Sequence, residues 1–369
     1  MLTKGDDYPI HQTPEPIAFS GTDRNFYDRY FFNGYRQDGS GFFAVAFGVY
    51  PHLNVADAHV SVLRDGKQIS LHASRELNME RMELSVGPIA IDVLEPLHRL
   101  KIAIDSGEGV RGELVCEGRS FPVQEPRFTR RNGPRLLMDL TRFTQAVRWS
   151  GCIEIDGKRE EYAAASTYGV RDRSWGVRPI GAADAQPMAP PMSPQFYWLW
   201  APTNFPNVAL YYHVNQDAEG LPWNERCTLA PDGVDAHGQV HLHEPRIHMT
   251  WAHGKRWASE MLLQVKDPSG RDHVVRWTPL STFLMKGIGY SHPEWGHGAY
   301  KGRLAVARED FDPAALDPLA PMHLHIQAIC TARHEGPGGL AADGVGAFEQ
   351  LVIGPHAPSN FKSVLDGAA

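Results

Sequence analysis

A short segment near the middle of the chain combines charged, aromatic and glycine residues in a way that favours a pocket. It spans residues 168–179 and holds Asp172 between Arg171 and Arg173, followed by Trp175. Unpaired charges are costly to bury, so the segment is either a pocket wall or a structural cluster of arginines and acid. An arginine partner would keep the pKa of Asp172 low, whereas an apolar cavity would raise it and make Asp172 a candidate general acid. The sequence leaves both alternatives open.

A second segment dense in chemical groups spans residues 290–298 and contains His292, Glu294, Trp295 and His297. Its proline and glycines predict a loop. Two histidines and a carboxylate are a common catalytic metal set, although the helical His-Glu-x-x-His frame is absent. The alternatives are metal ligation, proton transfer without a metal, and a loop whose side chains hydrogen-bond one another. We expect the second, with His292, Glu294 and His297 positioning or relaying protons.

Two strands are expected to present further pocket residues. Alternation along residues 322–332 places His323 and His325 on one face. The same alternation along residues 196–200 places Trp198 and Trp200 together, as in the wall of a site for a bulky apolar ligand. Ordinary β-sheet core is the alternative for the tryptophans, and solvent is the alternative for the histidines.

The elements that must position these residues are mostly short strands. Turn signals recur throughout the chain, and Asp-Gly turns at 65–66 and 156–157 each predict a hairpin. Residues 135–147 carry apolar side chains at helical spacing after a Gly-Pro pair, which predicts one helix. Residues 181–194 are rich in proline and predict a linker or long loop. We therefore expect an all-β fold of sandwiches or barrels with few short helices.

The length of the chain, 369 residues, favours two domains. We place an N-terminal β domain at 1–180, the proline-rich segment at 181–194 and a C-terminal β domain at 195–369. Charged residues make up 21% of the chain and the net charge is −7, with no basic tract, so a nucleic acid partner is not expected.

The four cysteines form no CxxC pair, which argues against a zinc cage or a disulfide framework and suits a reducing compartment. No apolar run reaches the length of a membrane span, and the N-terminus lacks the apolar core of a secretory signal. We therefore expect a cytoplasmic protein that does not insert into membranes, and leave a homodimer open. The motifs of dinucleotide-binding enzymes, P-loop proteins and serine hydrolases of the nucleophile-elbow type are absent.

Residues 169–176 resemble the Tyr-x-Asp-His-x-Trp-Gly signature of the carotenoid 1,2-hydratase (hydroxyneurosporene synthase)/AttH-like family. The loop at 292–298 looks like a feature of an uncharacterised bacterial branch of that group. The resemblance implies two lipocalin/calycin-like antiparallel β domains, and relatives that include hydratases of isoprenoid double bonds and pericyclic cyclases. It also implies that Asp172 is the acid that protonates the alkene. The chain departs from the signature at Val170, where the family has tyrosine, and at Arg173, where it has histidine.

Together these features predict a cofactor-independent lyase or isomerase of the hydratase, dehydratase or cyclase type, with no metal. Its substrate would be a hydrophobic, isoprenoid- or polyketide-like small molecule. Asp172, His292, Glu294 and His297 are the expected catalytic residues. The expected substrate-binding residues are Tyr168, Arg171, Arg173, Trp175, Trp198, Trp200, Trp295, His323 and His325. The alternatives are a non-enzymatic carrier of an apolar ligand and a metal-dependent enzyme built on histidine and glutamate.

Overall fold

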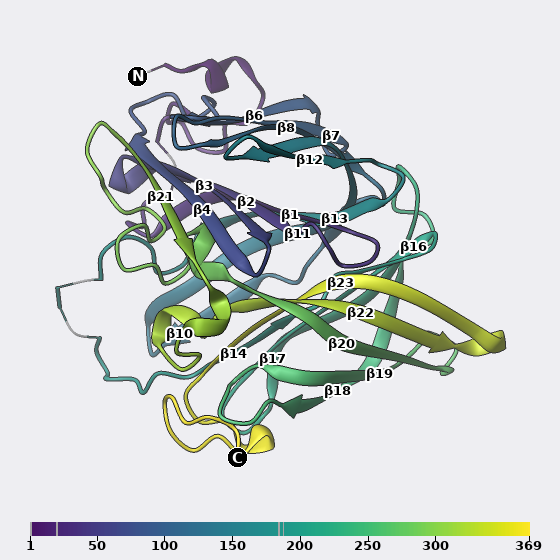
Figure 1. Cartoon of the computed structure of the whole chain (residues 1–369). Coiled ribbons are helices and arrows are strands. Elements are labelled where there is room, and N and C mark those ends of the chain that lie inside the picture. Colours follow the sequence, from purple (N-terminus) through teal and green to yellow (C-terminus); the bar gives the residue numbers. More distant parts are fainter. Residues whose placement is uncertain (1, 20, 184, 187) are drawn as a thin grey trace.

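The computed structural model describes residues 2–19, 21–183, 185–186 and 188–369, and it confirms the all-β architecture (Figure 1). Two lipocalin-like antiparallel barrels, closed or nearly closed, lie one above the other. The helices of the described residues are all short 3-10 turns, and none is long and apolar enough to cross a membrane. They are η1 (Lys4–Asp7), η2 (Pro51–Leu53), η3 (Met285–Ile288), η4 (Pro313–Ala315), η5 (Pro321–His323), η6 (Pro337–Gly339) and η7 (Ala357–Ser359).

The first sheet forms the barrel drawn at the top of Figure 1. Its main path runs in the order β21, β4, β3, β2, β1, β13, β11, β8, β7, β6, β5, and β9, β10 and β12 pair with β11. The strands are β1 (Phe26–Arg36), β2 (Phe43–Tyr50), β3 (Val55–Arg64), β4 (Lys67–Glu76), β5 (Ser85–Val86), β6 (Ile89–Glu95), β7 (Arg99–Asp105), β8 (Val110–Gly118), β9 (Val123–Gln124), β10 (Phe128–Asn132), β11 (Arg135–Ile155), β12 (Lys158–Tyr162), β13 (Thr167–Val177) and β21 (Leu304–Phe311).

The second sheet forms the lower barrel, in the order β14, β16, β15, β23, β22, β20, β19, β18, β17. Further pairings of β14 with β23 and of β16 with β17 close it. The strands are β14 (Phe196–Trp200), β15 (Thr203–Phe205), β16 (Val208–Gln216), β17 (Pro222–Pro231), β18 (Val240–Trp251), β19 (Ala258–Lys266), β20 (Asp272–Leu284), β22 (Ile326–Gly336) and β23 (Leu340–Ile353).

One strand from the second half of the chain belongs to the first barrel. β21 pairs antiparallel with β4 over its whole length, so the two barrels do not coincide with residues 1–180 and 195–369. The described residues of the proline-rich segment 181–194 lie between β13 and β14 and form no strand; residues 184 and 187 lie outside the described part. The segment therefore joins the barrels, while β21 returns to the first.

The two predicted hairpins are confirmed, and the predicted helix is wrong. β3 pairs with β4 and β11 pairs with β12, in each case through an Asp-Gly turn whose two residues have positive φ. Residues 135–147 belong to the long strand β11, which pairs with β10, β9 and β13. Their apolar side chains matched a helical period, but the β-branched and aromatic residues among them suit a strand, and pairing with neighbours decides the outcome.

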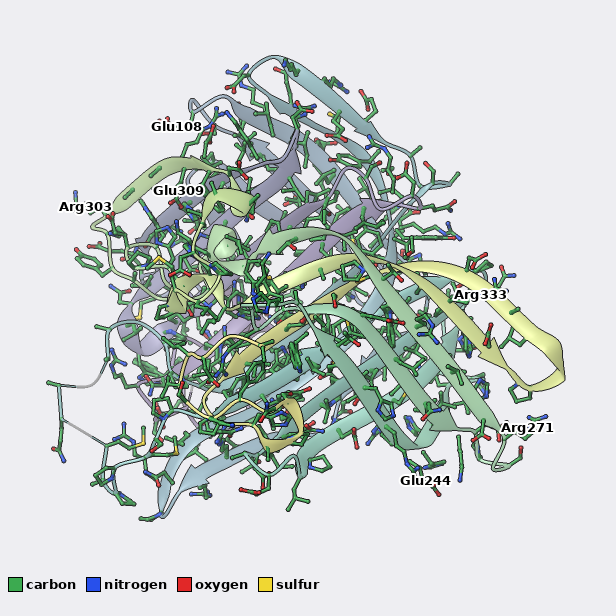
Figure 2. The ribbon with its side chains drawn as sticks, turned by 60° about the horizontal axis from the view of Figure 1, so that its bottom comes forward. Glu108, Glu244, Arg271, Arg303, Glu309 and Arg333 are labelled. Atoms are coloured by element: carbon green, nitrogen blue, oxygen red, sulfur yellow. The ribbon has the colours of Figure 1, made fainter. Side chains whose placement is uncertain are left out.

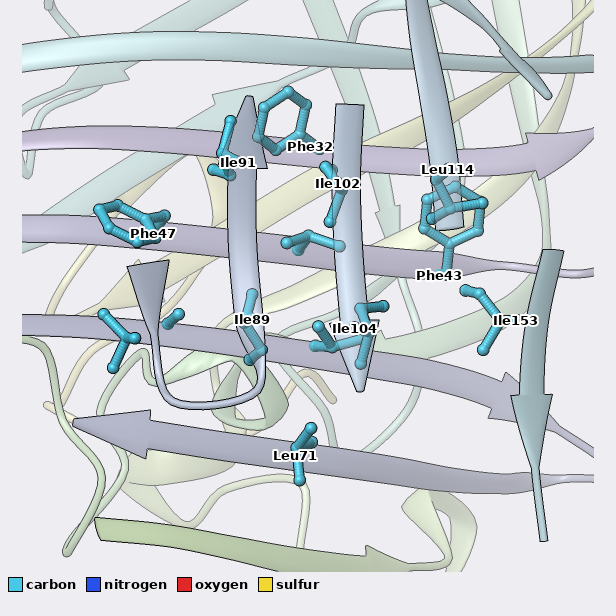
Figure 3. Close-up of a cluster of buried hydrophobic side chains, with 14 of the residues drawn as sticks. Phe32, Phe43, Phe47, Leu71, Ile89, Ile91, Ile102, Ile104, Leu114 and Ile153 are labelled. Atoms are coloured by element: carbon cyan, nitrogen blue, oxygen red, sulfur yellow. The ribbon is translucent and has the colours of Figure 1, made fainter. Parts of the chain in front are cut away.

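The apolar side chains form three clusters, one inside each barrel and one between them. The cluster inside the first barrel is shown in Figure 3, where Phe32, Phe43 and Ile102 pack among neighbours from crossing strands. A second fills the other barrel around Trp277. The third joins the barrels and includes Trp200. Side chains alternate between the two faces of a strand. A sheet that faces the other barrel therefore contributes side chains both to the cluster inside its own barrel and to the cluster between the barrels.

Gly169, in the charged and aromatic segment 168–179, is required by close packing. It lies opposite Gly34 in the β1–β13 pair, and the indole of Trp149 covers both glycines. The indole Nε1 donates to the backbone oxygen of Asn33 at 2.8 Å. A Cβ at Gly169 would lie 2.0 Å from that oxygen, so no side chain fits here.

We expect Gly169→Ala to lower the free energy of unfolding by about 2–3 kcal/mol, because backbone and indole must both move. Gly107→Ala is the matched control, since a Cβ there meets nothing within 4 Å. It should change stability by less than about 0.5 kcal/mol. Urea unfolding of both variants followed by tryptophan fluorescence measures the difference, and equal stability of the two would contradict the packing argument.

Candidate active site

A cavity of about 400 Å³ lies between the barrels and contains Asp172. We call it the Asp172 cavity. The wall from the first barrel is formed by β1, β10, β11 and β13. The wall from the second barrel is formed by β14, β16, β23 and the segment just before β22. The lining residues are Tyr27, Phe128, Met138, Leu140, Arg142, Asp172, Ser174, Arg178, Pro179, Phe196, Trp198, Asn215, Tyr290, His325, Glu349, Leu351 and Ile353. The cavity thus has apolar walls and a few polar groups, as ligand sites usually do.

Strand alternation along β13 separates Asp172 from the arginines beside it. Asp172 and Ser174 face the cavity, whereas Arg171 and Arg173 face the opposite side of the sheet. Arg171 Nε donates to Gln145 Oε1 at 2.7 Å, and Arg173 binds the carboxylate of Asp28. The neighbouring arginines are therefore engaged elsewhere and do not line the Asp172 cavity, and their role in substrate binding stays a prediction.

The carboxyl group of Asp172 is buried and accepts no hydrogen bond from the described residues; its side chain is 8% exposed. Burial raises its pKa to about 7; the charge of Arg142 opposes this rise, and those of Glu125 and Glu349 add to it. Of the two alternatives for Asp172, an arginine partner or an apolar cavity, the structure shows the apolar cavity. At neutral pH Asp172 is poised to give or take a proton.

Glu349 on β23 is the second buried carboxyl group of the cavity. Unlike Asp172, it is surrounded by hydrogen-bond donors. Its Oε1 accepts from Trp198 Nε1 and His325 Nε2, both at 2.8 Å, and its Oε2 accepts from Gln327 Nε2 at 2.8 Å. Burial acts to raise the pKa of Glu349, but these donors lower it below its usual value. Glu349 is therefore the ionised partner of a protonatable Asp172.

A third carboxylate, Glu125, neutralises the arginine nearest Asp172. Arg142 donates to Glu125 Oε2 from Nε at 2.8 Å, and Thr144 donates to Oε1 at 2.7 Å. The Arg142 guanidinium also lies 4.6 Å from the ring centre of Trp198. The ion pair of Arg142 and Glu125 lies against the ring of Trp198. Because its two charges are opposite, its net charge at the cavity is small.

The loop 290–298 reaches the Asp172 cavity through Tyr290 alone. The Tyr290 ring lies 4.6 Å from the ring of His325, which lines the cavity. His297 Nδ1 faces Arg29 NH1 at 2.5 Å, and its Nε2 donates to Ile288 O at 3.0 Å. Burial and the nearby arginines hold the pKa of His297 well below its usual value. His297 is thus a neutral structural group beside the cavity, and Glu294 is exposed on the surface.

His292 belongs to a cluster of potential metal ligands that does not include His297. Three potential metal-ligand atoms lie within 4.8 Å of one another, one each from His72, His292 and Glu309. They lie on the side of the first barrel where β21 carries Glu309 (Figure 2). His292 Nδ1 accepts the backbone N–H groups of Glu294 and Trp295 at 3.0 and 2.9 Å. The ring proton of His292 therefore sits on Nε2, which faces Glu309 Oε2 at 3.1 Å. A protonated Nε2 has no lone pair to offer a metal ion, so these hydrogen bonds disfavour metal binding by His292.

The remaining predicted residues divide between the cavity and other surroundings. Trp198 and His325 line the cavity. Trp200 lies behind its wall, donating to Glu125 Oε1 at 3.2 Å. The others lie elsewhere: Tyr168 lines a separate cavity, Trp175 is 39% exposed, Trp295 stacks on His72, and His323 sits in η5 bonded to Asp317 O. The predicted strand 322–332 begins only at Ile326, so His323 and His325 do not share a strand face.

Several cavity residues were missed by the sequence analysis. Glu349 and Arg142 carry no local motif, and alternation alone marks them as facing one side of a strand. Ser174, Arg178 and Tyr290 lie within the two segments that the sequence does single out. Membership of those segments was the one signal that could have identified these three residues.

Comparisons with known proteins place the fold. A family model described as "Family of unknown function (DUF8625)" matches residues 2–362. No curated protein matches. A structure of CghA with Sch210972 is 12% identical, with 89% of each chain covered and a TM-score of 0.52. A putative AttH from Nitrosomonas europaea is 14% identical, covering 93% of this chain and 98% of that one, with a TM-score of 0.51. Kievitone hydratase from Nectria haematococca is 10% identical over 88% of each chain, with a TM-score of 0.46.

At these identities the likeness shows a shared fold. The AttH-like structure confirms the fold that the resemblance of residues 169–176 implied. The uncharacterised bacterial branch stays a prediction.

The raised pKa of Asp172 predicts a pH-dependent effect of removing its charge. The folded pKa of about 7 exceeds the ordinary value of 3.8, so the folded chain keeps a proton that the unfolded chain releases between these pH values. The stability contributed by this group is full below about pH 4 and is lost as the pH rises through 7. Asp172→Asn should therefore gain stability over the wild type on going from pH 4 to pH 8, by on the order of 2–4 kcal/mol.

Chemical unfolding at both pH values measures this difference. Asp65→Asn, at an exposed turn position, is the control and should show no such pH dependence. Parallel pH curves for the wild type and Asp172→Asn would show that Asp172 is ionised in the folded protein.

Proposed function

The chain belongs to the family of unknown function DUF8625, and we propose that it is an acid–base enzyme of the lyase or isomerase type. Its substrate would be a largely apolar small molecule held in the Asp172 cavity, and its own side chains would supply both acid and base. The observation that carries this proposal is the pair of buried carboxyl groups with opposite environments. Asp172 lacks a hydrogen bond from the described residues, while Glu349 accepts three. Two carboxyl groups whose surroundings push their pKa values apart are the usual basis of an acid and base pair.

The chemistry follows from the protonated form of Asp172. Its O–H proton adds to one carbon of a substrate double bond, the neighbouring carbon becomes cationic, and Asp172 becomes a carboxylate. Water then adds to the cationic carbon, and its released proton returns to Asp172, so that an alkene and water become an alcohol. The reverse sequence removes water. Attack by a second double bond in place of water would close a ring and form a new carbocation, which would then lose a proton to the Asp172 carboxylate.

The walls of the Asp172 cavity suit such an intermediate. The ring of Trp198 faces the cavity, and Phe128 packs against it with ring centres 5.8 Å apart. Aromatic faces stabilise nearby positive charge, and the carboxylate of Glu349 adds to that stabilisation. Leu140, Leu351 and Ile353 complete an apolar lining that would bind a hydrocarbon body.

The resemblance of residues 169–176 supports this assignment, because the acid of that signature corresponds to Asp172. The arginine at 173, where the signature has histidine, points to the other side of the sheet and binds Asp28. This departure from the signature therefore adds no ion pair at Asp172. CghA, a protein of the same fold, was solved with Sch210972. We infer an isoprenoid- or polyketide-like substrate from the apolar lining and from this resemblance.

We expect Asp172→Asn to lower turnover by about 10²–10⁴-fold, because the proton donor is lost while the cavity keeps its shape. Product formation is measured by mass spectrometry on a panel of isoprenoid and polyketide-like alkenes and alcohols, scored for gain or loss of water and for isomerisation. Since the protonated form is the active one, wild-type turnover should fall about tenfold per pH unit above about pH 7.

Binding separates an enzyme from a carrier in the same experiment. The affinity of Asp172→Asn for an active substrate should stay within about threefold of the wild type, as an uncharged acid and an amide are similar in size. Asp65→Asn serves as the control with full turnover. Tight binding of panel compounds without conversion by the wild type would instead support a non-enzymatic carrier, and full turnover by Asp172→Asn would remove the acid from the mechanism.

A further inference from the structure

Two arginines near the Asp172 cavity, the buried Arg29 and the half-buried Arg178, lack a carboxylate partner. Among the described residues no carboxylate oxygen lies within 4 Å of the guanidinium of Arg29 or Arg178, and the Nε of each is buried without a hydrogen bond. Arg29 is 1% exposed. By contrast, the buried arginines Arg119 and Arg256 pair with Asp232 and Asp366, each at 2.7 Å.

The groups that surround these two cations are neutral. Arg29 and Arg178 both direct a nitrogen to His297 Nδ1, at 2.5 and 3.2 Å, and burial holds the pKa of this histidine low. The Arg178 guanidinium lies 4.5 Å from the ring centre of Tyr27 and 5.5 Å from that of Tyr290. A histidine lone pair accepts a hydrogen bond and tyrosine rings offer π-density, but none supplies the negative charge that a buried cation such as Arg29 needs.

Arg178 differs from a cation enclosed in the core because it borders open space. It lines the Asp172 cavity and also a larger adjoining cavity of about 720 Å³, and the two cavities share Arg178, Pro179 and Tyr290 as lining residues. Arg171 also lacks a carboxylate partner, but it lies inside the first barrel with its Nε bonded to Gln145. Arg178 is thus placed where a ligand in either cavity could touch it.

Arg178 and Asp172 both line the Asp172 cavity. The charges that act most on the pKa of Asp172 are those of Arg142, Glu125, Glu349 and Arg29, and Arg178 is not among them. The lining of this cavity therefore combines a protonatable acid, a cation without a carboxylate counter-ion and several apolar side chains. A ligand that fits this arrangement has an apolar body and one negatively charged oxygen.

We propose that Arg178, supported by the charge of Arg29, is the binding site for an oxyanion of the substrate, either a carboxylate or an ionised enol. The inference rests on the proposed function, since it assigns a substrate class to the same cavity. A guanidinium offers planar N–H donors that suit such an anion, and Arg178 lines both cavities from which an anion could reach it. The anion would supply the missing counter-charge, and the apolar body would then lie toward Asp172.

Displacement of the neutral fluorophore Nile red by three probes tests this at pH 7.5. Geranic acid and geraniol share a carbon skeleton and differ in charge, and 4-hydroxycoumarin carries an ionised enol. We expect geranic acid, 4-hydroxycoumarin or both to bind about 10- to 100-fold more tightly than geraniol, as for a hydrogen bond to a charged group. The tighter of the two anions identifies the carboxylate or the enolate as the preferred group.

The variants assign that preference to Arg178. Arg178→Gln should reduce the anion preference to about twofold or less while leaving geraniol binding unchanged, and Arg178→Lys should restore part of it. Arg271→Gln is the control, because Arg271 lies at the tip of the β19–β20 hairpin and pairs with Asp267 (Figure 2). It should keep the wild-type preference.

Failure of both anions to bind more tightly than geraniol in the wild type would overturn the inference, even if Arg178→Gln did not fold. An unchanged preference in folded Arg178→Gln would overturn it as well. Asp172→Asn should keep the preference, so this result is independent of turnover. A protein that loses turnover in Asp172→Asn but shows no anion preference would refute the oxyanion site alone.

Discussion

A buried chain of hydrogen bonds across the two barrels is the constraint on which the site depends. The backbone N–H of Val170 donates to Asn33 Oδ1 at 2.9 Å, Asn33 Nδ2 donates to Gln327 Oε1 at 3.0 Å, and Gln327 Nε2 donates to Glu349 at 2.8 Å. The chain begins two residues from Asp172 on β13 and ends at the other carboxyl group of the cavity. Every member of this chain is buried, so breaking one of its hydrogen bonds would leave polar groups with neither a protein partner nor water. The free-energy cost of doing so holds the two barrels in one relative position.

Within that frame, the difference between the two carboxyl groups arises from hydrogen bonding. Both are buried, and burial alone raises the pKa of each. Glu349 stays ionised because Trp198, His325 and Gln327 donate to it, and these donors belong to the second barrel itself. Asp172 comes from the first barrel and meets no such donor in the described part of the chain. The junction of two barrels thus brings together an acid and a base that neither barrel would form alone.

The parts of this arrangement that follow from local sequence were predictable, and the parts that follow from pairing were not. Asp-Gly turns and strand periodicity identified the hairpins and the all-β class, and the charged segment identified Asp172. Alternation could have shown that Arg171 and Arg173 face away from Asp172 once residues 167–177 were taken as a strand. Glu349 and Arg142 join the site only because β23 and β11 meet across the barrels, and the helical spacing in residues 135–147 hid the strand that carries Arg142.

The charges around the cavity also connect the acid to the cations. Burial is the main cause of the pKa of about 7 of Asp172; the negative charges of Glu125 and Glu349 add to the rise, and the positive charges of Arg142 and Arg29 oppose it. Glu125 already neutralises Arg142, but Arg29 has no such partner among the described residues. An anion bound beside Arg178 and Arg29 would screen the charge of Arg29 and raise the pKa of Asp172 further. Binding of an acidic substrate would therefore increase the protonated fraction of Asp172 when the proton is needed.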